Sequence, residues 1–323
     1  MTRHLLPARG ARFAIGRDST TIRGVMLVTG AALAFATLGT LSGIAYRAGM
    51  GSATFVALRA VLGAALLIGV LAARPAAHVS LRSLRGSEKL ILAAAMGANA
   101  TLNLALFAAY GQMAVALVLA VYFTYPMLVA GLSVLIGRER FTAARSVGLL
   151  MAGIGVAMVL AGQVGDARLT VVGVIWALSA AGCQALYLVL SRASFTQVPA
   201  EQAIAITLGG GGVLAIGVAL AVDLPAGQLL SWADNPGAWA AVVTAAVLGA
   251  AAAKVWLLRG VRLLGGTRTA VIMLIEPIAG VLLAAAVLGQ GLTPLQALGG
   301  AAILGAALLV KRPAPGPAAP VTT

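Results

Sequence analysis

Long apolar segments dominate the chain, and each is bounded by a short charged, polar or Pro/Gly-rich stretch. An apolar run of about 18 residues or more is long enough to cross a bilayer as a helix. The pattern predicts an all-α integral membrane protein with ten transmembrane helices, joined by short connections. The predicted spans lie near residues 24–46, 53–73, 89–110, 114–137, 144–162, 170–191, 202–222, 238–258, 269–289 and 294–310.

Composition supports lipid as the main solvent of the chain. Hydrophobic residues make up 61% and charged residues 9% of the 323 positions, and the mean hydropathy is +1.03. Soluble domains carry about 25% charged residues, so this chain could not cover a water-exposed surface with its few charges. We therefore expect a multi-pass protein of the cell (inner) membrane, with the lipid bilayer as its main partner.

The basic residues orient the predicted helices. Eighteen of the 22 Lys and Arg residues fall in segments on one side, whereas Arg47 and Arg168 alone fall in loops on the other. Cytoplasmic loops concentrate Lys and Arg, so both termini are predicted to be cytoplasmic. The basic cytoplasmic loops also explain the net charge of +14, so binding to nucleic acid is not needed to account for it. The sequence contains no nucleic-acid-binding motif. Aromatic residues expected at the outer interface are Tyr46, Tyr110, Trp232 and Trp239.

An internal repeat is visible when the sequence is shifted by 151 residues, which places Pro126 on Pro277. The charged turn 138–140 then falls on the uncharged turn 289–291. Five helices per repeat is an odd number, so the second repeat must cross the membrane upside down, and the loss of charge fits that inversion. The predicted organisation is a cytoplasmic N-terminal segment (1–23), two inverted five-helix repeats (24–162 and 170–310) and a disordered cytoplasmic tail (311–323). The N-terminal segment leads into the first span without a clear cleavage site, as in an uncleaved signal anchor.

Three stretches carry a resemblance to a known family. They are TYPMLVAGLSVLIGRERFTAARSVGLLMAGIGVAMVLAG (124–162), IEPIAGVLLAAAVLGQGLTPLQALGGAAILGAALLV (275–310) and VALRAVLGAALL (56–67). With two five-helix halves, the chain resembles the drug/metabolite transporter superfamily, EamA type. The resemblance implies transport of amino acids, sugars, nucleotides or drugs. The second half of the sequence departs from the family pattern at Gln290, where many relatives carry Glu.

Three charged residues fall within predicted spans. Arg59, Lys254 and Glu276 are expected to face a cavity or a partner, because an unpaired charge at the bilayer centre costs about 2.5–3.5 kcal/mol. Arg59 is a candidate for binding a substrate carboxylate. Glu276 is a candidate ligand for a substrate ammonium group or a group that couples transport to protons. The alternatives are a static salt bridge from Glu276 to Lys254 or Arg59, and snorkelling of both basic side chains.

Two prolines occupy matching positions inside predicted helices of the two repeats. Pro126 and Pro277 each remove one backbone hydrogen bond, so we expect kinks that free the carbonyl groups of Tyr122 and Met273. Irregular backbone in a membrane is tolerated where it lines a cavity or finds new partners. The matching positions favour a gating role for both kinks over a packing role.

Polar pairs complete the candidate substrate cavity, since residues three or four apart share one face of a helix. Interhelical hydrogen bonding is the simpler interpretation of each pair alone. As one set facing a cavity, they extend the candidate site. The pairs are Asn99 with Asn103, Tyr122 with Tyr125, and Gln184 with Tyr187.

The sequence favours a secondary transporter that works by alternating access. It moves small polar metabolites such as amino acids, with export favoured over import and protons as a candidate coupling ion. No ATP-binding motif is present, and no catalytic residue, metal site or cofactor is expected. A membrane-embedded enzyme and a channel-like facilitator are the alternatives. An enzyme is disfavoured because His4 and His78 lie outside the spans and one intramembrane carboxylate cannot form an acid–base pair. The monomer and the homodimer both stay open.

Overall fold

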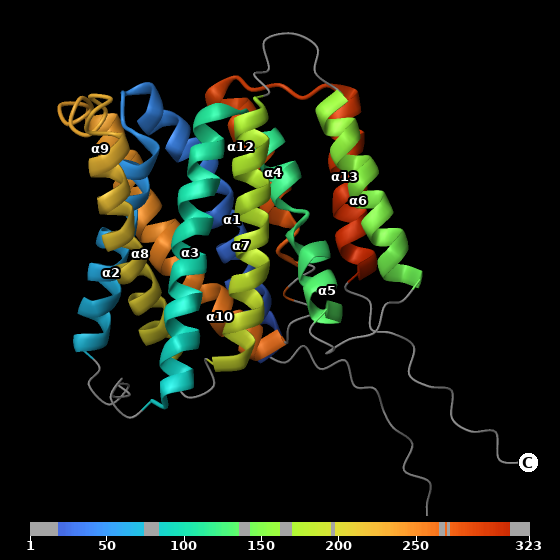
Figure 1. Cartoon of the computed structure of the whole chain (residues 1–323), viewed down its shortest axis with the longest axis horizontal. Coiled ribbons are helices and arrows are strands. Elements are labelled where there is room, and N and C mark those ends of the chain that lie inside the picture. Colours follow the sequence, from blue (N-terminus) through green and yellow to red (C-terminus); the bar gives the residue numbers. More distant parts are fainter. Residues whose placement is uncertain are drawn as a thin grey trace, which may run out of the picture.

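The computed structural model describes residues 19–73, 84–135, 143–161, 170–194, 198–264, 269 and 272–310. Every regular element in these residues is a helix, and the helices run side by side as one bundle (Figure 1). Helices are expected in lipid because they satisfy their own backbone hydrogen bonds. The predicted tail (311–323), most of the N-terminal segment and the charged turn 138–140 lie outside the described residues.

Six helices form the first half of the chain. They are α1 (Ser19–Arg47), α2 (Ser52–Ala72), α3 (Gly86–Gln112), α4 (Val115–Tyr122), α5 (Tyr125–Leu135) and α6 (Ala143–Ala161). The second half contains α7 (Val171–Ser194), α8 (Ala200–Val222), α9 (Pro236–Thr244), the π-helix η3 (Ala245–Ala252), α10 (Ala253–Leu264), α12 (Ile275–Leu288) and α13 (Pro294–Val310). The helical fold is therefore confirmed.

Six helical segments of the described chain are long and apolar enough to cross a membrane. They are Thr20–Arg47, Ser52–Ala72, Gly86–Gln112, Val171–Leu190, Glu201–Val222 and Pro236–Gly260. Four further apolar helices are shorter, at Val115–Val129, Ser146–Met158, Ile275–Leu288 and Pro294–Ala306. The membrane-spanning character of the bundle is thus clear from six helices, and the count of ten stays a prediction.

Two helices begin with a polar residue followed by proline. The Asn235 side chain accepts a hydrogen bond from the backbone N–H of Ala238, and Pro236 follows as the first helical residue of α9. Before α13, the Gln296 side chain accepts a hydrogen bond from the Thr293 N–H. A polar cap followed by proline is typical of a helix start, because proline lacks an N–H that would otherwise need a partner.

A two-residue turn lies beside each of the two prolines. The chain makes a turn at Phe123–Thr124 between α4 and α5, and a second turn at Met273–Leu274 directly before α12. Pro126 and Pro277 lie in the first turn of α5 and α12, where no intrahelical N–H bond is required. The helix is thus interrupted beside each proline by a turn rather than by a smooth kink, and the gating role of both positions stays a prediction.

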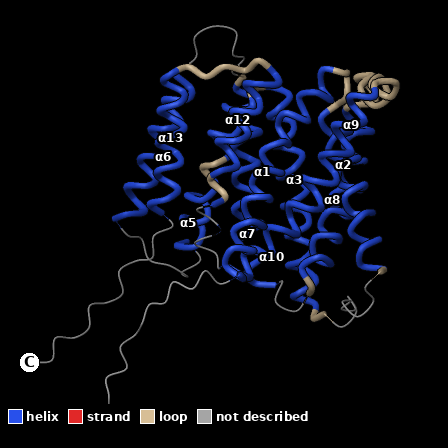
Figure 2. The backbone as a smooth tube through the Cα atoms, turned by 180° about the vertical axis from the view of Figure 1, so that it is seen from behind, coloured by secondary structure: helices blue, strands red, loops and turns tan. Residues whose placement is uncertain are grey.

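The carbonyl group of Met273, which we expected to be free, accepts a hydrogen bond from the Glu276 N–H at 3.1 Å. Both breaks lie within the depth of the bundle rather than at its ends (Figure 2). Broken helices at membrane depth are a feature of transporters that bind substrate at the break.

Helices of the two halves pack against each other in a reciprocal pattern. α3 packs on α7 while α1 packs on α10, α2 packs on α8, and α6 packs on α13. In each half the first helix contacts the third helix of the other half, and the second and fifth helices contact their own counterparts. This is the pairing that a two-fold relation between the halves produces.

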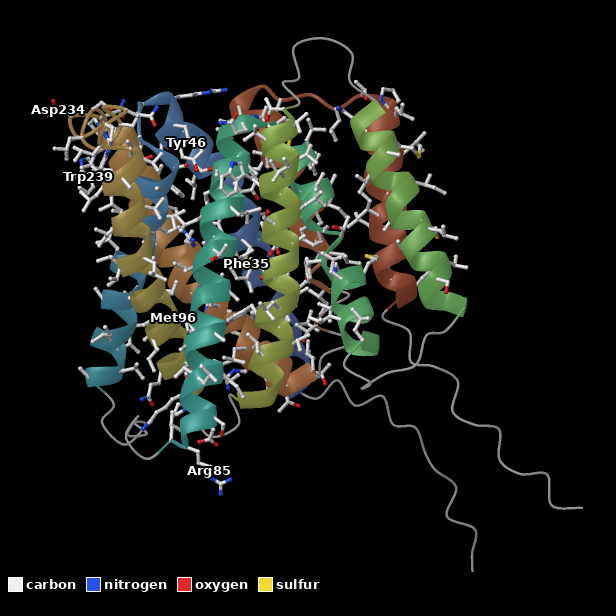
Figure 3. All side chains as sticks on the ribbon, viewed as in Figure 1. Phe35, Tyr46, Arg85, Met96, Asp234 and Trp239 are labelled. Carbon is white, nitrogen blue, oxygen red and sulfur yellow. The ribbon has the colours of Figure 1, made fainter. Side chains whose placement is uncertain are left out.

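Opposite ends of the bundle carry different connections. Tyr46, Asp234 and Trp239 lie at one end and Arg85 lies at the other (Figure 3). We call the first the α1–α2 end, because α1 and α2 meet there, and the second the α2–α3 end. The connection 289–293 lies at the α1–α2 end, whereas α6 begins at the α2–α3 end (Figure 1). α6 and α13 therefore run antiparallel, as an inverted repeat requires.

Candidate functional site

Arg59 is buried in the interior of the bundle. Only 1% of its surface is exposed, and its guanidinium lies over the ring of Phe107 at 4.7 Å from the ring centre. Its Nη2 donates a hydrogen bond to Oδ1 of Asn103 at 2.5 Å. The alternative that Arg59 snorkels to the membrane surface is therefore wrong. Within the described chain, Nε of Arg59 has no hydrogen-bond partner.

Two asparagines connect Arg59 to Lys254. Nδ2 of Asn103 donates to the backbone carbonyl of Asn99 at 2.6 Å, and Nζ of Lys254 donates to Oδ1 of Asn99 at 3.2 Å. Lys254 therefore also points into the bundle instead of snorkelling, and α10 continues for ten residues beyond it. Arg59, Asn99, Asn103 and Lys254 form one hydrogen-bonded group, which we call the cationic cluster.

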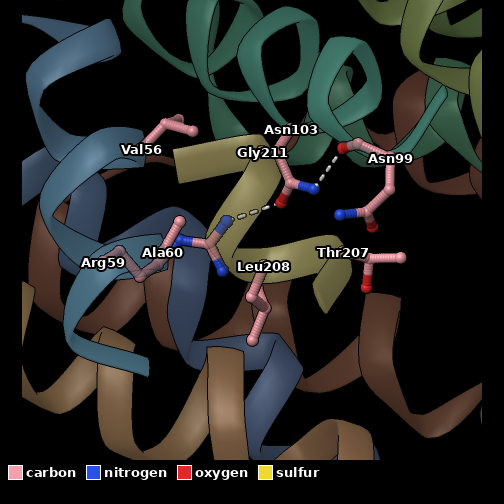
Figure 4. Close-up of a pocket in the computed structure, with 8 residues that line it drawn as sticks. All are labelled: Val56, Arg59, Ala60, Asn99, Asn103, Thr207, Leu208 and Gly211. Carbon is pink, nitrogen blue, oxygen red and sulfur yellow. Dashed lines mark hydrogen bonds between the residues drawn. The ribbon is translucent and has the colours of Figure 1, made fainter. Parts of the chain in front are cut away.

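A narrow cavity lies beside Arg59, between α2, α3 and α8. Figure 4 shows the guanidinium directed across it toward Asn103, with Thr207 on the far side. The close approach of α8 shapes this space, because a Cβ atom on Gly211 would lie 3.6 Å from the Cβ of Ala100 on α3. The lining residues are Val56, Arg59, Ala60, Asn99, Asn103, Thr207, Leu208 and Gly211.

The cationic cluster lies where the halves meet. Arg59 and the asparagines come from α2 and α3, whereas Thr207 and Lys254 come from α8 and α10. Under the repeat shift of 151 residues, Asn103 and Lys254 occupy equivalent positions of the two halves. The cluster therefore lies close to the axis that relates the halves. Binding sites of inverted-repeat transporters lie at this kind of interface.

Glu276 belongs to a second polar region, beside the helix breaks. Its carboxylate lies within electrostatic range of the phenol groups of Tyr110, Tyr122 and Tyr125. The Tyr122 and Tyr125 rings are 5.4 Å apart across the break between α4 and α5. In the part of the chain that the structure describes, Glu276 makes no salt bridge, so the predicted static pair with Lys254 or Arg59 is wrong.

Tyr110 lies between the two polar regions, within electrostatic range of both Arg59 and Glu276. Tyr46 lies at the α1–α2 end, and the outer-interface position of Tyr46 and Tyr110 stays a prediction. The Tyr46 ring packs on Phe55 and the Tyr110 ring packs on Phe107. The Tyr46 hydroxyl donates to the Phe107 carbonyl at 2.9 Å. The local sequence pattern gives no sign of these contacts.

Gln184 and Tyr187 lie half-buried on α7, which packs against α3, α4 and α5. Neither is among the residues that line the cavity beside Arg59. Among the described residues, no group of three His, Cys, Asp or Glu side chains could hold a metal ion. The positions of Thr207 and Phe107 beside the cationic cluster were missed, because neither residue carries a charge that sets it apart within its apolar span.

Comparison with known proteins decides the family. The model of the EamA-like transporter family matches residues 22–161 and, a second time, residues 171–312. The chain belongs to the EamA-like transporter family. The double match means that each half of this EamA-like chain resembles the same family unit. The chain is therefore a multi-pass membrane protein from a family of transporters rather than enzymes.

A solved structure described as "Crystal structure of protein" is similar to this EamA-like chain, with a TM-score of 0.61. The similarity covers 88% of this chain and 95% of the other, at 20% sequence identity. At that identity the likeness concerns the fold alone. A comparison with curated proteins finds no match.

Proposed function

We propose that this chain is a secondary transporter that moves small polar metabolites, such as amino acids, across the cell membrane by alternating access. The observation that carries the proposal is the buried cationic cluster at the meeting point of the two halves. Buried charges in a membrane protein are costly and mark substrate or ion pathways. A cluster with no other evident purpose, in a member of a transporter family, is best explained as a place where substrate binds.

In this proposal the chain crosses the membrane ten times, as two inverted repeats of five spans, with both termini in the cytoplasm. The shorter apolar helices α12 and α13, and the broken pair α4 and α5, complete the repeats. The antiparallel pair α6 and α13 and the reciprocal packing of the halves support this arrangement. Rocking of one half against the other would then expose the cationic cluster to each side in turn.

Hydrogen bonds between the halves favour a state closed at the α1–α2 end. Nη2 of Arg47 donates to the Leu288 carbonyl at 2.7 Å, joining the end of α1 to the end of α12. The N–H of Val115 at the start of α4 donates to Oε1 of Gln290 at 2.9 Å. With the α1–α2 end assigned as the outer side, as the distribution of basic residues predicts, these bonds must break before substrate can leave outward.

Glu276 is proposed as the proton-coupling group. It faces α1 and α4, because Gly280 one turn later packs against Leu119 and Ala36. A carboxylate without a salt-bridge partner in the described chain can gain and lose a proton without breaking an ion pair. Its place beside a helix break means that its surroundings change when α12 moves relative to α4.

Purified protein in proteoliposomes tests the proposed function. Cells that overexpress the chain are first screened for resistance to toxic metabolites, because an exporter lowers the internal concentration of its substrate. Uptake of the metabolites found is then measured with and without a pH gradient, beside liposomes that lack the protein. Resistance of the cells together with saturable uptake into proteoliposomes supports transport. Activity that does not saturate would point to the channel-like alternative, and no movement of any candidate would contradict the proposal.

A further inference from the structure

Among the described residues, no acidic side chain pairs with the cationic cluster. Of the chain's eight acidic residues, five lie in the described part. Glu88 accepts from the Arg85 N–H, Glu201 pairs with Arg259 at 3.5 Å, and Asp223 accepts from Thr54. Asp234 is exposed at the α1–α2 end, and Glu276 lies beside the tyrosines. The remaining acids, Asp18, Glu139 and Asp166, belong to segments between or before the spans.

Neutral amide oxygens occupy the positions where an anion would be expected. Arg59 donates to Oδ1 of Asn103, and Lys254 donates to Oδ1 of Asn99. An amide oxygen carries only a partial charge, so it compensates a buried cation less well than a carboxylate does. Arg59 also keeps a buried donor, Nε, without an acceptor in the described chain. The cluster therefore has spare donors and uncompensated positive charge on the edge of a cavity.

We propose that Arg59 binds the carboxylate group of the transported substrate in this cavity, while Lys254, bonded to Asn99 of the cavity wall, adds positive charge nearby. The inference rests on the proposed function and adds the chemical class of the substrate. A planar guanidinium matches the two oxygens of a carboxylate, and here Nη2 points to Asn103 on the cavity wall while Nε is buried without an acceptor in the described chain. The bound carboxylate takes over the hydrogen bond that Oδ1 of Asn103 accepts from Arg59.

The cavity is much smaller than a site for a drug-sized ligand, which encloses about 300–1,000 Å³, so it can receive at most one group of the substrate. Part of its wall is apolar, from Val56, Ala60 and Leu208, and part is polar. The rest of the substrate must lie outside it, toward the interface of the halves.

Asn103 offers a test that separates a substrate role from a structural one. Asn103→Asp keeps the shape of the side chain and its bond to Arg59, but it places a permanent carboxylate in the site. The substrate carboxylate must then compete with a tethered one, so its affinity falls about tenfold or more, the factor that one charge-assisted hydrogen bond contributes. Asn103→Ala removes the amide that bonds to Arg59, so the affinity for the substrate carboxylate stays equal or rises. If Asn103 only held α2 and α3 together, Asn103→Asp would lower the affinity less than Asn103→Ala does.

Binding is measured on the purified full-length chain as a shift of the melting temperature. The probes are propionate, succinate and phenylacetate, each beside its amide, with propylamine and inorganic phosphate as further controls. We expect stabilisation by at least one carboxylate and none by its amide, by the amine or by phosphate. Arg59→Gln should abolish the shift, and Arg59→Lys, which keeps the charge but loses the planar fork, should weaken it if the first variant does not fold.

Equal stabilisation by an acid and its amide, stabilisation by phosphate alone, or no response to any carboxylate would overturn the inference. A carboxylate-induced shift of the melting temperature that persists in both Arg59→Gln and Arg59→Lys would also overturn the inference. Transport of substrates that all lack a carboxylate would also overturn it while leaving the transporter proposal standing. Conversely, the chain could bind carboxylates through Arg59 and yet transport no substrate. That result would support the carboxylate site and contradict the proposed transport function.

Discussion

Asp223, directly after α8, forms two hydrogen bonds with Thr54 in the first turn of α2. Its Oδ2 accepts from the Thr54 N–H at 2.6 Å and from the Thr54 hydroxyl at 2.8 Å, and Asp223 is only 2% exposed. A carboxylate at a helix N-terminus satisfies a free N–H and interacts favourably with the helix dipole. A residue of the second half thus caps a helix of the first, at the end of the bundle where Arg47 and Gln290 also join the halves.

Loss of this cap is predicted to destabilise the protein. Asp223→Ala leaves a buried N–H without its acceptor, so we expect a loss of about 1–3 kcal/mol and a lower melting temperature. Asp234→Ala, in the same connection but exposed, is the matched control and should change little. A double-mutant cycle with Thr54→Val measures the coupling. Simple additivity of the two changes would mean that the Thr54 hydroxyl contributes nothing to the cap.

Gly51 is predicted to be intolerant of any side chain. A Cβ atom there would overlap the carboxylate group of Asp223, and the backbone φ of −70° is ordinary, so the conflict is steric alone. Gly51→Ala must displace the carboxylate and should lower the melting temperature.

Gly69→Ala is the control for Gly51. Gly69 lies within α2, and no neighbouring atom lies within 4 Å of the position that a Cβ atom would take. Alanine there should stabilise the helix by about 0.5–1 kcal/mol. The Asp223→Ala background should make Gly51→Ala much milder. Unchanged melting of Gly51→Ala in the native background would contradict the close contact.

Glu276 and Gln290 are predicted to respond differently to exchange between acid and amide. Glu276→Gln removes the group that gains and loses the proton in the proposed coupling, so transport driven by a pH gradient should fall about tenfold or more, which corresponds to about 1.4 kcal/mol or more. Gln290→Glu keeps an acceptor for the Val115 N–H and adds charge at a helix N-terminus, so transport should be retained. Initial rates in proteoliposomes, normalised to inserted protein, compare the two. Wild-type transport by Glu276→Gln would remove this residue from the mechanism.

Labelling of single cysteines is predicted to place the ends of the bundle on opposite sides of the membrane. Cys183 is first replaced by Ala, and a cysteine is introduced at Leu292 or at Arg85, both exposed positions at opposite ends. A membrane-impermeant maleimide should label Leu292→Cys in intact cells. Arg85→Cys should react only after the cells are permeabilised. Reaction of both from the same side would contradict the inverted arrangement.

The sequence by itself determined the membrane class, the helical segments, the repeat and the three intramembrane charges. These follow from composition and from features local in the chain, which are the length of the apolar runs and the charge at their ends. Lipid requires every span to satisfy its own backbone, so local sequence predicts the helices well.

Tertiary structure decided which polar groups meet. The spans are apolar on almost every face, so periodicity does not say which side of a helix points inward. Arg59 could equally have reached the membrane surface, and only the packing of α8 against α2 and α3 buries it beside Asn103. The cap of Thr54 by Asp223 and the linking position of Tyr110 join residues far apart in the chain, and such contacts form only when the halves pack together.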